Sequence, residues 1–223
     1  MIIWYHLSEK RGRIREGEGA PPEGWSAEPR TPNDMGRAIE SPQNQGTSFM
    51  ALVSYVPTSE AAENIRPHFV KVESRGHEVP NFLRVLAHSP ELLEGFIALN
   101  GALGRIKLDP KLRELAYIRA SEVNSCGYCL QHHKKAGRKA GLDERQVNET
   151  DSYSGSESEI YDDLQRDVLQ YAEEVTRNVV VTDELVDRLE QKLTERELVE
   201  LAVAVALANF TNRISETLRL ELP

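Results

Sequence analysis

The chain has 223 residues, of which 39% are hydrophobic and 28% charged, and this fits one sizeable domain or two small ones around a packed core. The net charge of −9 comes without a basic block, which argues against a nucleic-acid or anionic-membrane surface, because phosphate groups are bound by clustered Lys and Arg. Two Cys are too few for a secreted scaffold held together by several disulfides.

The amino-terminal residues are expected to form an arm outside the core. Residues 1–49 hold 5 of the 11 Pro and 6 of the 14 Gly, and they show no helical or strand periodicity. Such a segment buries too little apolar surface to offset its ordering entropy. We therefore predict an extended or poorly ordered arm over 1–49 and a folded domain over 50–223. The alternative is that translation starts at Met50.

Targeting features predict a cytoplasmic protein. The segment Met1–Tyr5 is apolar, but it is too short for a secretory core and no basic segment precedes it. The longest strongly apolar stretch, Leu201–Ala208, is far shorter than the roughly 20 residues that a membrane-spanning helix needs. This stretch is expected to belong to a core helix.

From about residue 57 onward, the sequence predicts a succession of helices. Residue types that cap helix starts are followed by Pro or Glu, and Gly residues supply the stops. The expected helices of this part are 90–103 between Ser89 and Gly104, a second opening at Asp109 and Pro110, a third from near Ser125 to Gly137 or Gly141, and a short fourth starting at Asp143.

Residues 151–158 are polar and loop-like, and more helices are expected after them. Apolar residues then recur at spacings of three and four, which marks one helical face: Ile160, Leu164, Val168, Tyr171 and Val175. A short helix is expected from Thr182 to Gln191. Thr194 and Glu197 fit a capping box that opens a long apolar helix. Apart from 52–56, no alternating strand-like stretch of useful length exists, so the predicted fold class is all-α, a bundle of packed helices.

Both Cys of the chain, Cys126 and Cys129, lie near the expected start of a helix. A thiol pair at this spacing can close into a disulfide within one helical turn, and Gly127 between them relaxes the backbone for that closure. The amides and dipole of a helix amino terminus stabilise a thiolate, which lowers the pKa of the Cys and makes it a better nucleophile. In a reducing cytoplasm, the pair indicates redox work or metal binding rather than a structural disulfide.

Two further side chains complete the candidate site. His133 follows Cys129 by one helical repeat, so the two share a face, and the imidazole can take the thiol proton or hold the thiolate as an ion pair. Glu114 lies on the preceding helix, and packing of the two helices would let its carboxylate orient the His or pass protons through a water. Together these residues would supply a nucleophile, a resolving thiol, a base and an orienting group.

Other interpretations of these residues stay open. Cys126, Cys129, His132 and His133 could ligate zinc, although four ligands on one short helix give poor tetrahedral geometry, or the two Cys could be plain packing residues. His132 points about 100° away from His133 on a helix and is expected to face solvent or to be structural. Two aromatic residues are expected to belong to the core or to a pocket wall, Tyr117 and Tyr128. The remaining His residues are structural by default: His6, His68, His77 and His88.

The spacing Glu114-x11-Cys126-x2-Cys129-x3-His133 resembles the motif of the AhpD-like alkylhydroperoxidases, within the carboxymuconolactone decarboxylase superfamily. Further segments resemble its peroxidase-related branch: Val79-Pro80-Asn81-Phe82 ahead of Ser89-Pro90-Glu91-Leu92, Asn124-x-Cys126-x-Tyr128-Cys129, and Asn209-Phe210-x-Asn212-Arg213. The resemblance covers about Leu52 to Pro223 and not residues 1–49. The chain departs from the best-studied members at Tyr128, where they have a His directly before the second Cys.

The resemblance implies an AhpD-like helical bundle that assembles into homo-oligomers, built around dimers and often trimers or hexamers. It implies reduction of organic hydroperoxides or hydrogen peroxide by thiols, without a metal or haem cofactor. Carried over, Cys129 attacks the peroxide, Cys126 resolves the sulfenic acid as a disulfide, and Glu114 and His133 form the proton relay. A dithiol donor, such as a lipoyl group on a partner protein, then re-reduces the pair.

Three other activities are weighed against this one. Members of the superfamily that lack the Cys pair decarboxylate a lactone, and the pair argues against that activity here. A general dithiol–disulfide oxidoreductase or redox sensor would use the same thiols without a peroxide pocket. A non-enzymatic oligomeric scaffold would keep the helical bundle and have inert, buried thiols. No nucleic-acid or membrane partner is expected for any of them.

Overall fold

The computed structural model describes residues 50–154 and 159–222. The chain divides into two units, residues 1–47 and 48–223, and everything below concerns the second unit. The arm predicted over 1–49 lies outside the described residues, as do residues 155–158 of the loop predicted over 151–158.

The described residues form nine α-helices and one short 3₁₀ helix and contain no strand, so the all-α prediction is confirmed. The stretch 52–56 is extended but pairs with no other strand among these residues. In chain order the elements are α1 (Arg66–Glu73), α2 (Asn81–Leu86), α3 (Pro90–Leu103), α4 (Pro110–Val123), α5 (Gly127–Ala140), α6 (Glu144–Asn148), η1 (Thr150–Ser154), α7 (Asp163–Asn178), α8 (Asp183–Glu190) and α9 (Glu195–Thr217).

Most of the predicted helix starts and stops are confirmed at the level of individual caps. The capping box of Thr194 and Glu197 is present at the start of α9. At the start of α4, the Asp109 side chain accepts a hydrogen bond from the backbone N–H of Lys111. Gly141 ends α5 in the left-handed conformation with φ of 96°, which a residue with a Cβ adopts only at a cost.

Two of these local predictions were wrong in detail. Ser89 precedes α3, but its side chain makes no capping hydrogen bond. The helix expected to begin near Ser125 begins at Gly127. Ser125 instead takes a positive φ of 54°, and Cys126 is the residue that caps the helix with its side chain. The sharp turn at Ser125 therefore puts the first Cys, rather than the Ser, at the helix start.

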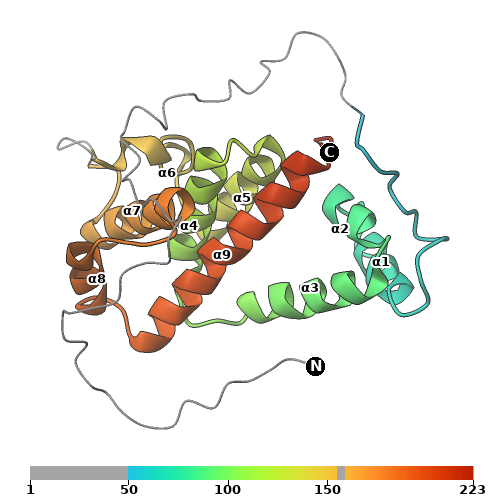
Figure 1. Cartoon of the computed structure of the whole chain (residues 1–223), viewed down its shortest axis with the longest axis horizontal. Coiled ribbons are helices and arrows are strands. Elements are labelled where there is room, and N and C mark those ends of the chain that lie inside the picture. Colours follow the sequence, from blue (N-terminus) through green and yellow to red (C-terminus); the bar gives the residue numbers. More distant parts are fainter. Residues whose placement is uncertain (1–49, 155–158, 223) are drawn as a thin grey trace, which may run out of the picture. The chain divides into compact units, whose positions relative to one another are not determined.

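Helix α4 is the centre of the bundle, because it packs against α5, α7 and α9. Figure 1 shows α1, α2 and α3 on one side of α9 and α6, α7 and α8 on the other. Among the described residues, α9 is the helix long and apolar enough to span a membrane by length and composition, but 50% of its apolar window is buried inside the molecule. It contacts α4, α5, α7 and α8, which is the pattern of the core helix that Leu201–Ala208 predicted.

The helices that precede α4 complete the surroundings of the Cys pair. Phe69 of α1, Phe82 of α2 and Leu93 of α3 belong to one buried cluster that also contains Cys126 and Cys129. Removal of this much apolar surface from water stabilises the contact between the amino-terminal helices and the start of α5. The first turn of α5 is therefore covered by α1–α3 while its other side packs on α4.

Candidate active site

The two sulfur atoms lie side by side at the amino terminus of α5. The Sγ atoms of Cys126 and Cys129 are 2.6 Å apart, and both residues are buried free thiols. Cys126 is the N-cap residue, and its sulfur accepts a hydrogen bond of 3.3 Å from the backbone N–H of Cys129. One turn of helix thus holds the two thiols where little movement would join them in a disulfide.

The two thiols differ in acidity. Cys126 donates its hydrogen to the sulfur of Cys129, and this hydrogen bond is the largest cause that lowers the pKa of Cys129, against burial, which would raise it. The same hydrogen bond, together with burial, raises the pKa of Cys126. A proton held by Cys126 leaves Cys129 as the thiolate, and the thiolate is the nucleophilic form.

Helix α9 adds three polar side chains around the Cys129 sulfur. The Ser215 Oγ lies 3.7 Å from the sulfur, and hydrogen bonding with Asn212, Ser215 and Thr211 lowers the pKa of Cys129 further. All three are buried in the second half of α9. None of them was predicted as a site residue, although buried polar residues on a core helix need partners and could have marked them.

Glu114 and His133 are in contact, as their positions on consecutive helices allowed. The His133 Nδ1 lies 2.8 Å from the Glu114 Oε2, and Arg113 donates to the other carboxylate oxygen at 2.8 and 3.0 Å. Burial would raise the pKa of Glu114, but its hydrogen bonds and charge interactions with His133 and Arg113 hold that pKa below the usual value. The carboxylate can only accept, so Nδ1 of His133 carries the proton and Nε2 is left as an acceptor.

Tyr117 fixes the plane of the His133 ring. The two rings stack with their centroids 3.5 Å apart and an angle of 13° between their planes. The Tyr117 hydroxyl is 2.7 Å from the Thr211 Oγ1, which ties the tyrosine to α9. The imidazole therefore has one preferred orientation, set by Glu114 at one edge and by Tyr117 across its face.

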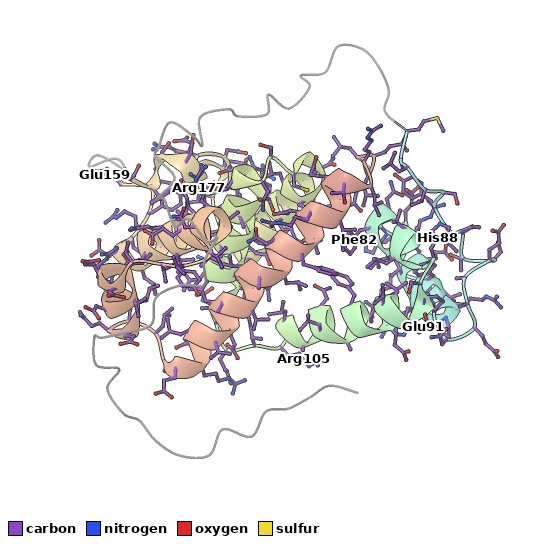
Figure 2. The ribbon with its side chains drawn as sticks, in the orientation of Figure 1. Phe82, His88, Glu91, Arg105, Glu159 and Arg177 are labelled. Atoms are coloured by element: carbon purple, nitrogen blue, oxygen red, sulfur yellow. The ribbon has the colours of Figure 1, made fainter. Side chains whose placement is uncertain are left out.

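A cavity of about 230 Å³ opens onto Cys129 and His133. Its walls are largely aromatic, with Phe82 of α2, Phe96 of α3, and Tyr117 and Tyr128. Figure 2 shows Phe82 on the side of α2 that faces α9, and its backbone N–H donates to the Tyr128 hydroxyl at 3.1 Å. Burial raises the pKa of Tyr117, and that of Tyr128 to about 12, so both stay neutral wall residues, as expected from the sequence.

Of the two placements expected for His132, solvent-facing or structural, the structure excludes the first. His132 lines the same cavity, and its ring lies beside that of Tyr128, at 4.8 Å between centroids. Its Nε2 is buried and makes no hydrogen bond to any residue that the structure describes. Burial is the first cause that lowers its pKa, so the ring is neutral. His132 follows Tyr128 by four residues, so the two side chains share one face of α5. Because Tyr128 is buried, this spacing indicates the placement of His132 better than its angle to His133 does.

In the part of the chain that the structure describes, Cys126, Cys129, His132 and His133 are not arranged as a set of zinc ligands. No group of three or more His, Cys, Asp or Glu side chains is arranged there to hold a metal ion. His133 is engaged by Glu114, and His132 faces Tyr128.

The difference in acidity predicts how the thiols react with an alkylating reagent. A lowered pKa means that Cys129 is already a thiolate at pH values where a free Cys, with a pKa of about 8.5, is protonated. We expect the rate of iodoacetamide labelling to rise with pH through a midpoint below 8.5, with the label on Cys129 by peptide mass spectrometry. Labelling first at Cys126, or no labelling of the native protein at any pH, would contradict this assignment and favour inert thiols.

Comparison with known proteins agrees with the fold and the motif. Residues 90–152 match the model of the carboxymuconolactone decarboxylase family. The chain is 32% identical over 111 residues to the uncharacterized protein YdfG of Bacillus subtilis (strain 168), covering 46% of this chain and 70% of that protein. A structure of an uncharacterized peroxidase-related protein with an alkylhydroperoxidase AhpD core, from Ralstonia eutropha JMP134, superimposes with a TM-score of 0.68 at 21% identity, over 79% of this chain and 94% of the other.

A second solved structure with this fold is that of a protein named as a debrominase. The debrominase Bmp8, in complex with 2,3,4-tribromopyrrole, superimposes with a TM-score of 0.67 at 21% identity, over 79% of this chain and 94% of that one. The fold alone therefore does not fix the reaction, which has to be argued from the site. The match to the family model, the relation to YdfG and the shared all-α fold establish that the chain belongs to the AhpD-like carboxymuconolactone decarboxylase superfamily.

Proposed function

We propose that the protein is a cytoplasmic thiol-dependent peroxidase that reduces hydroperoxides through Cys126 and Cys129. The observation that carries this proposal is the acidic sulfur of Cys129, which has a second thiol 2.6 Å away and opens onto a cavity shared with His133. Membership of an enzyme superfamily with peroxidase-related structural neighbours supports the same conclusion.

The reaction begins with attack of the Cys129 thiolate on a peroxide oxygen. The O–O bond breaks, Cys129 becomes a sulfenic acid, and the other oxygen leaves as an alkoxide that takes a proton and departs as the alcohol. The pair of His133 and Glu114 is suited to hold and deliver that proton, because Glu114 keeps the ring oriented and stabilises its protonated form. General acid–base assistance of this kind contributes typically about 10²–10⁴-fold to a rate.

Cys126 completes the cycle. Its sulfur attacks the sulfenic acid of Cys129, a disulfide forms, and water leaves. Two thiols have then been oxidised and one hydroperoxide reduced to an alcohol and water. No metal or haem takes part in these steps. An external dithiol, such as a lipoyl group carried by a partner protein, returns the pair to the thiol form by exchange.

The cavity favours a peroxidase over a general dithiol oxidoreductase. An enzyme that exchanges disulfides with proteins needs its sulfur at an exposed surface, whereas Cys129 is 4% exposed and is reached through an aromatic-walled cavity of about 230 Å³. Ligand sites of drug-like size are about 300–1,000 Å³, so this cavity suits a compact substrate.

The test is peroxide consumption by the wild-type protein with dihydrolipoamide as donor. We expect catalysed consumption of cumene hydroperoxide or hydrogen peroxide. If the protein instead exchanges disulfides with an oxidised protein partner and peroxide does not accelerate oxidation of its thiols, the oxidoreductase is the better description.

We further propose that the protein is a homo-oligomer, joined through an apolar groove between α3 and α9. The groove has a volume of about 420 Å³ and an almost entirely apolar lining. The large apolar side chains exposed on these two helices are Leu92, Leu99, Val199, Val203 and Phe210. Apolar surface gathered in this way on two adjacent helices is typical of an interface.

A charge in this groove is expected to break the oligomer. Val203→Glu would leave a buried, unpaired carboxylate at the contact, and we expect light scattering coupled to gel filtration to show a smaller particle than for the wild type. Val180→Glu is the matched control, because Val180 is equally apolar and 69% exposed but lies outside the groove. A monomeric wild-type protein would contradict the proposal.

A further inference from the structure

A chain of hydrogen-bonded side-chain amides runs through the molecule to Asn212, one helical turn before Ser215, whose Oγ lies 3.7 Å from the Cys129 sulfur. Asn209 of α9 donates to the Thr176 Oγ1 of α7 at 3.0 Å. Asn124, the residue that ends α4, donates to the Oδ1 atoms of Asn209 and Asn212 at 3.0 and 2.9 Å. Asn212 in turn donates to the Ser121 Oγ at 3.0 Å. The chain thus links α7, α9 and α4 and ends at an amide beside the reactive sulfur.

The direction of this chain is fixed at the Asn209 end. The amide nitrogen of Asn209 faces the backbone carbonyl of Val205 at 3.0 Å, and a carbonyl can only accept. The amide oxygen of Asn209 faces the guanidinium of Arg213, which can only donate. Asn209 therefore has one allowed orientation, and Asn124 must present its amide nitrogen to the Asn209 oxygen.

The direction is fixed independently at the Asn212 end. The Ser121 hydroxyl has one hydrogen, which it donates to the backbone oxygen of Tyr117 at 2.8 Å, so its oxygen is left to accept from Asn212. Both ends agree that the Asn212 oxygen faces Asn124 and its nitrogen faces Ser121. The remaining hydrogen of that nitrogen is left for the Cys129 thiolate, and hydrogen bonding by Asn212 is among the causes that lower the pKa of Cys129.

We propose that Asn124 and Asn212 are positioning residues, in which Asn124 holds the Asn212 amide with an N–H toward the Cys129 sulfur and prevents the flipped amide. In the flipped amide, the partially negative oxygen would face the thiolate and destabilise it. Asn212 is fully buried, so water does not replace a lost hydrogen bond there. The inference rests on the proposed function in that it takes the Cys129 thiolate as the reactive species.

The test is the pH dependence of iodoacetamide labelling of Cys129 in two variants. Asn212→Leu keeps the volume of the side chain but removes the donor. We expect the midpoint to rise by about one pH unit from a pKa of about 7, which lowers the thiolate fraction at neutral pH about fivefold, as for one hydrogen bond to a charged group. Asn124→Ala leaves Asn212 in place but frees its amide to flip, and we expect a smaller rise. The ionisable groups around the sulfur pair are untouched by both substitutions: Cys126, Glu114, His133, Tyr117, Tyr128 and Glu216.

Asn148→Ala is the matched control, because the Asn148 amide is exposed on α6 and bonds only Glu144 and Lys134. Its labelling midpoint is expected to equal that of the wild type. Far-UV circular dichroism checks that each variant is helical. If Asn212→Leu does not fold, Asn124→Ala decides alone, and an unchanged midpoint in a folded variant overturns the inference. The titration contains no peroxide, so the inference can fail while peroxidase activity stands, and the reverse also holds.

Discussion

Replacement of Cys129 by Ser is expected to reduce catalysed peroxide consumption to the background rate, a loss of at least about 10³-fold. A serine hydroxyl is not ionised at neutral pH and is not oxidised by a hydroperoxide, so the first step has no nucleophile. Replacement of Cys126 by Ser has a different expected outcome. The new hydroxyl can still donate to the Cys129 thiolate, so attack proceeds once and stops at the sulfenic acid.

The two variants are compared in a single-turnover experiment without a thiol donor. Cys126→Ser is expected to consume about one equivalent of peroxide per chain and to be trapped by dimedone at Cys129. Cys129→Ser is expected to consume none and to give no dimedone adduct. The reverse pattern would exchange the roles of the two thiols, and full activity of Cys129→Ser in turnover would remove the proposed peroxidase.

Glu114→Gln is expected to lower kcat/KM for peroxide by about 10²-fold, the lower end of the usual contribution of acid–base assistance. The amide is nearly isosteric with the carboxylate, and its one oxygen can still accept from His133. Its NH2 group then faces the Arg113 guanidinium, so the substitution removes the negative charge and the hydrogen bonds from Arg113. Without that charge, the protonated imidazole that forms when the ring takes the thiol proton is less stable. Steady-state rates against peroxide concentration measure the effect.

Glu144→Gln is the control for this prediction. Glu144 also pairs with an Arg, Arg138, but on the surface of α6 and away from the cavity, so its loss is expected to leave the rate unchanged. Thermal unfolding separates the two roles that Glu114 can have. A wild-type rate combined with a lower melting temperature would mean that Glu114 only pairs with Arg113 and supports the fold.

The local chemistry of the sequence was sufficient to predict most of the helix boundaries. A Pro, an acidic or hydroxyl cap and a closing Gly act within one turn of the chain, so their effect is readable without knowledge of the fold. This is why the start of α9 at Thr194 and the end of α5 at Gly141 agree with the structure. The same locality explains the misplaced start of α5, because nothing near Ser125 in sequence announces its left-handed turn.

Some features of the candidate site also follow from local spacing, and others depend on how the helices pack. Cys126, Cys129 and His133 lie within two turns of one helix. Local spacing alone places the two sulfur atoms side by side and sets Cys129 and His133 on the wall of one cavity. The contact of Glu114 with His133 required α4 and α5 to pack side by side, which the sequence allowed but did not dictate. For His132 the sequence left a solvent-facing and a structural placement open, because an angle on a helix says nothing about which neighbours cover that side. Tyr128 and the cavity lie there.

By itself, the sequence determined that the protein is all-α, that its two thiols share a helix start and that an imidazole follows at helical spacing. Only the tertiary structure decided which thiol is the acidic one. The Cys126 thiol donates to the Cys129 sulfur, and three buried side chains of α9, far away along the chain, lower the pKa of Cys129 further: Thr211, Asn212 and Ser215. Helical periodicity acts over a few residues and leaves a record in the sequence. The acidity of a buried sulfur depends on every dipole that packing brings to it, and packing joins residues that no local pattern connects.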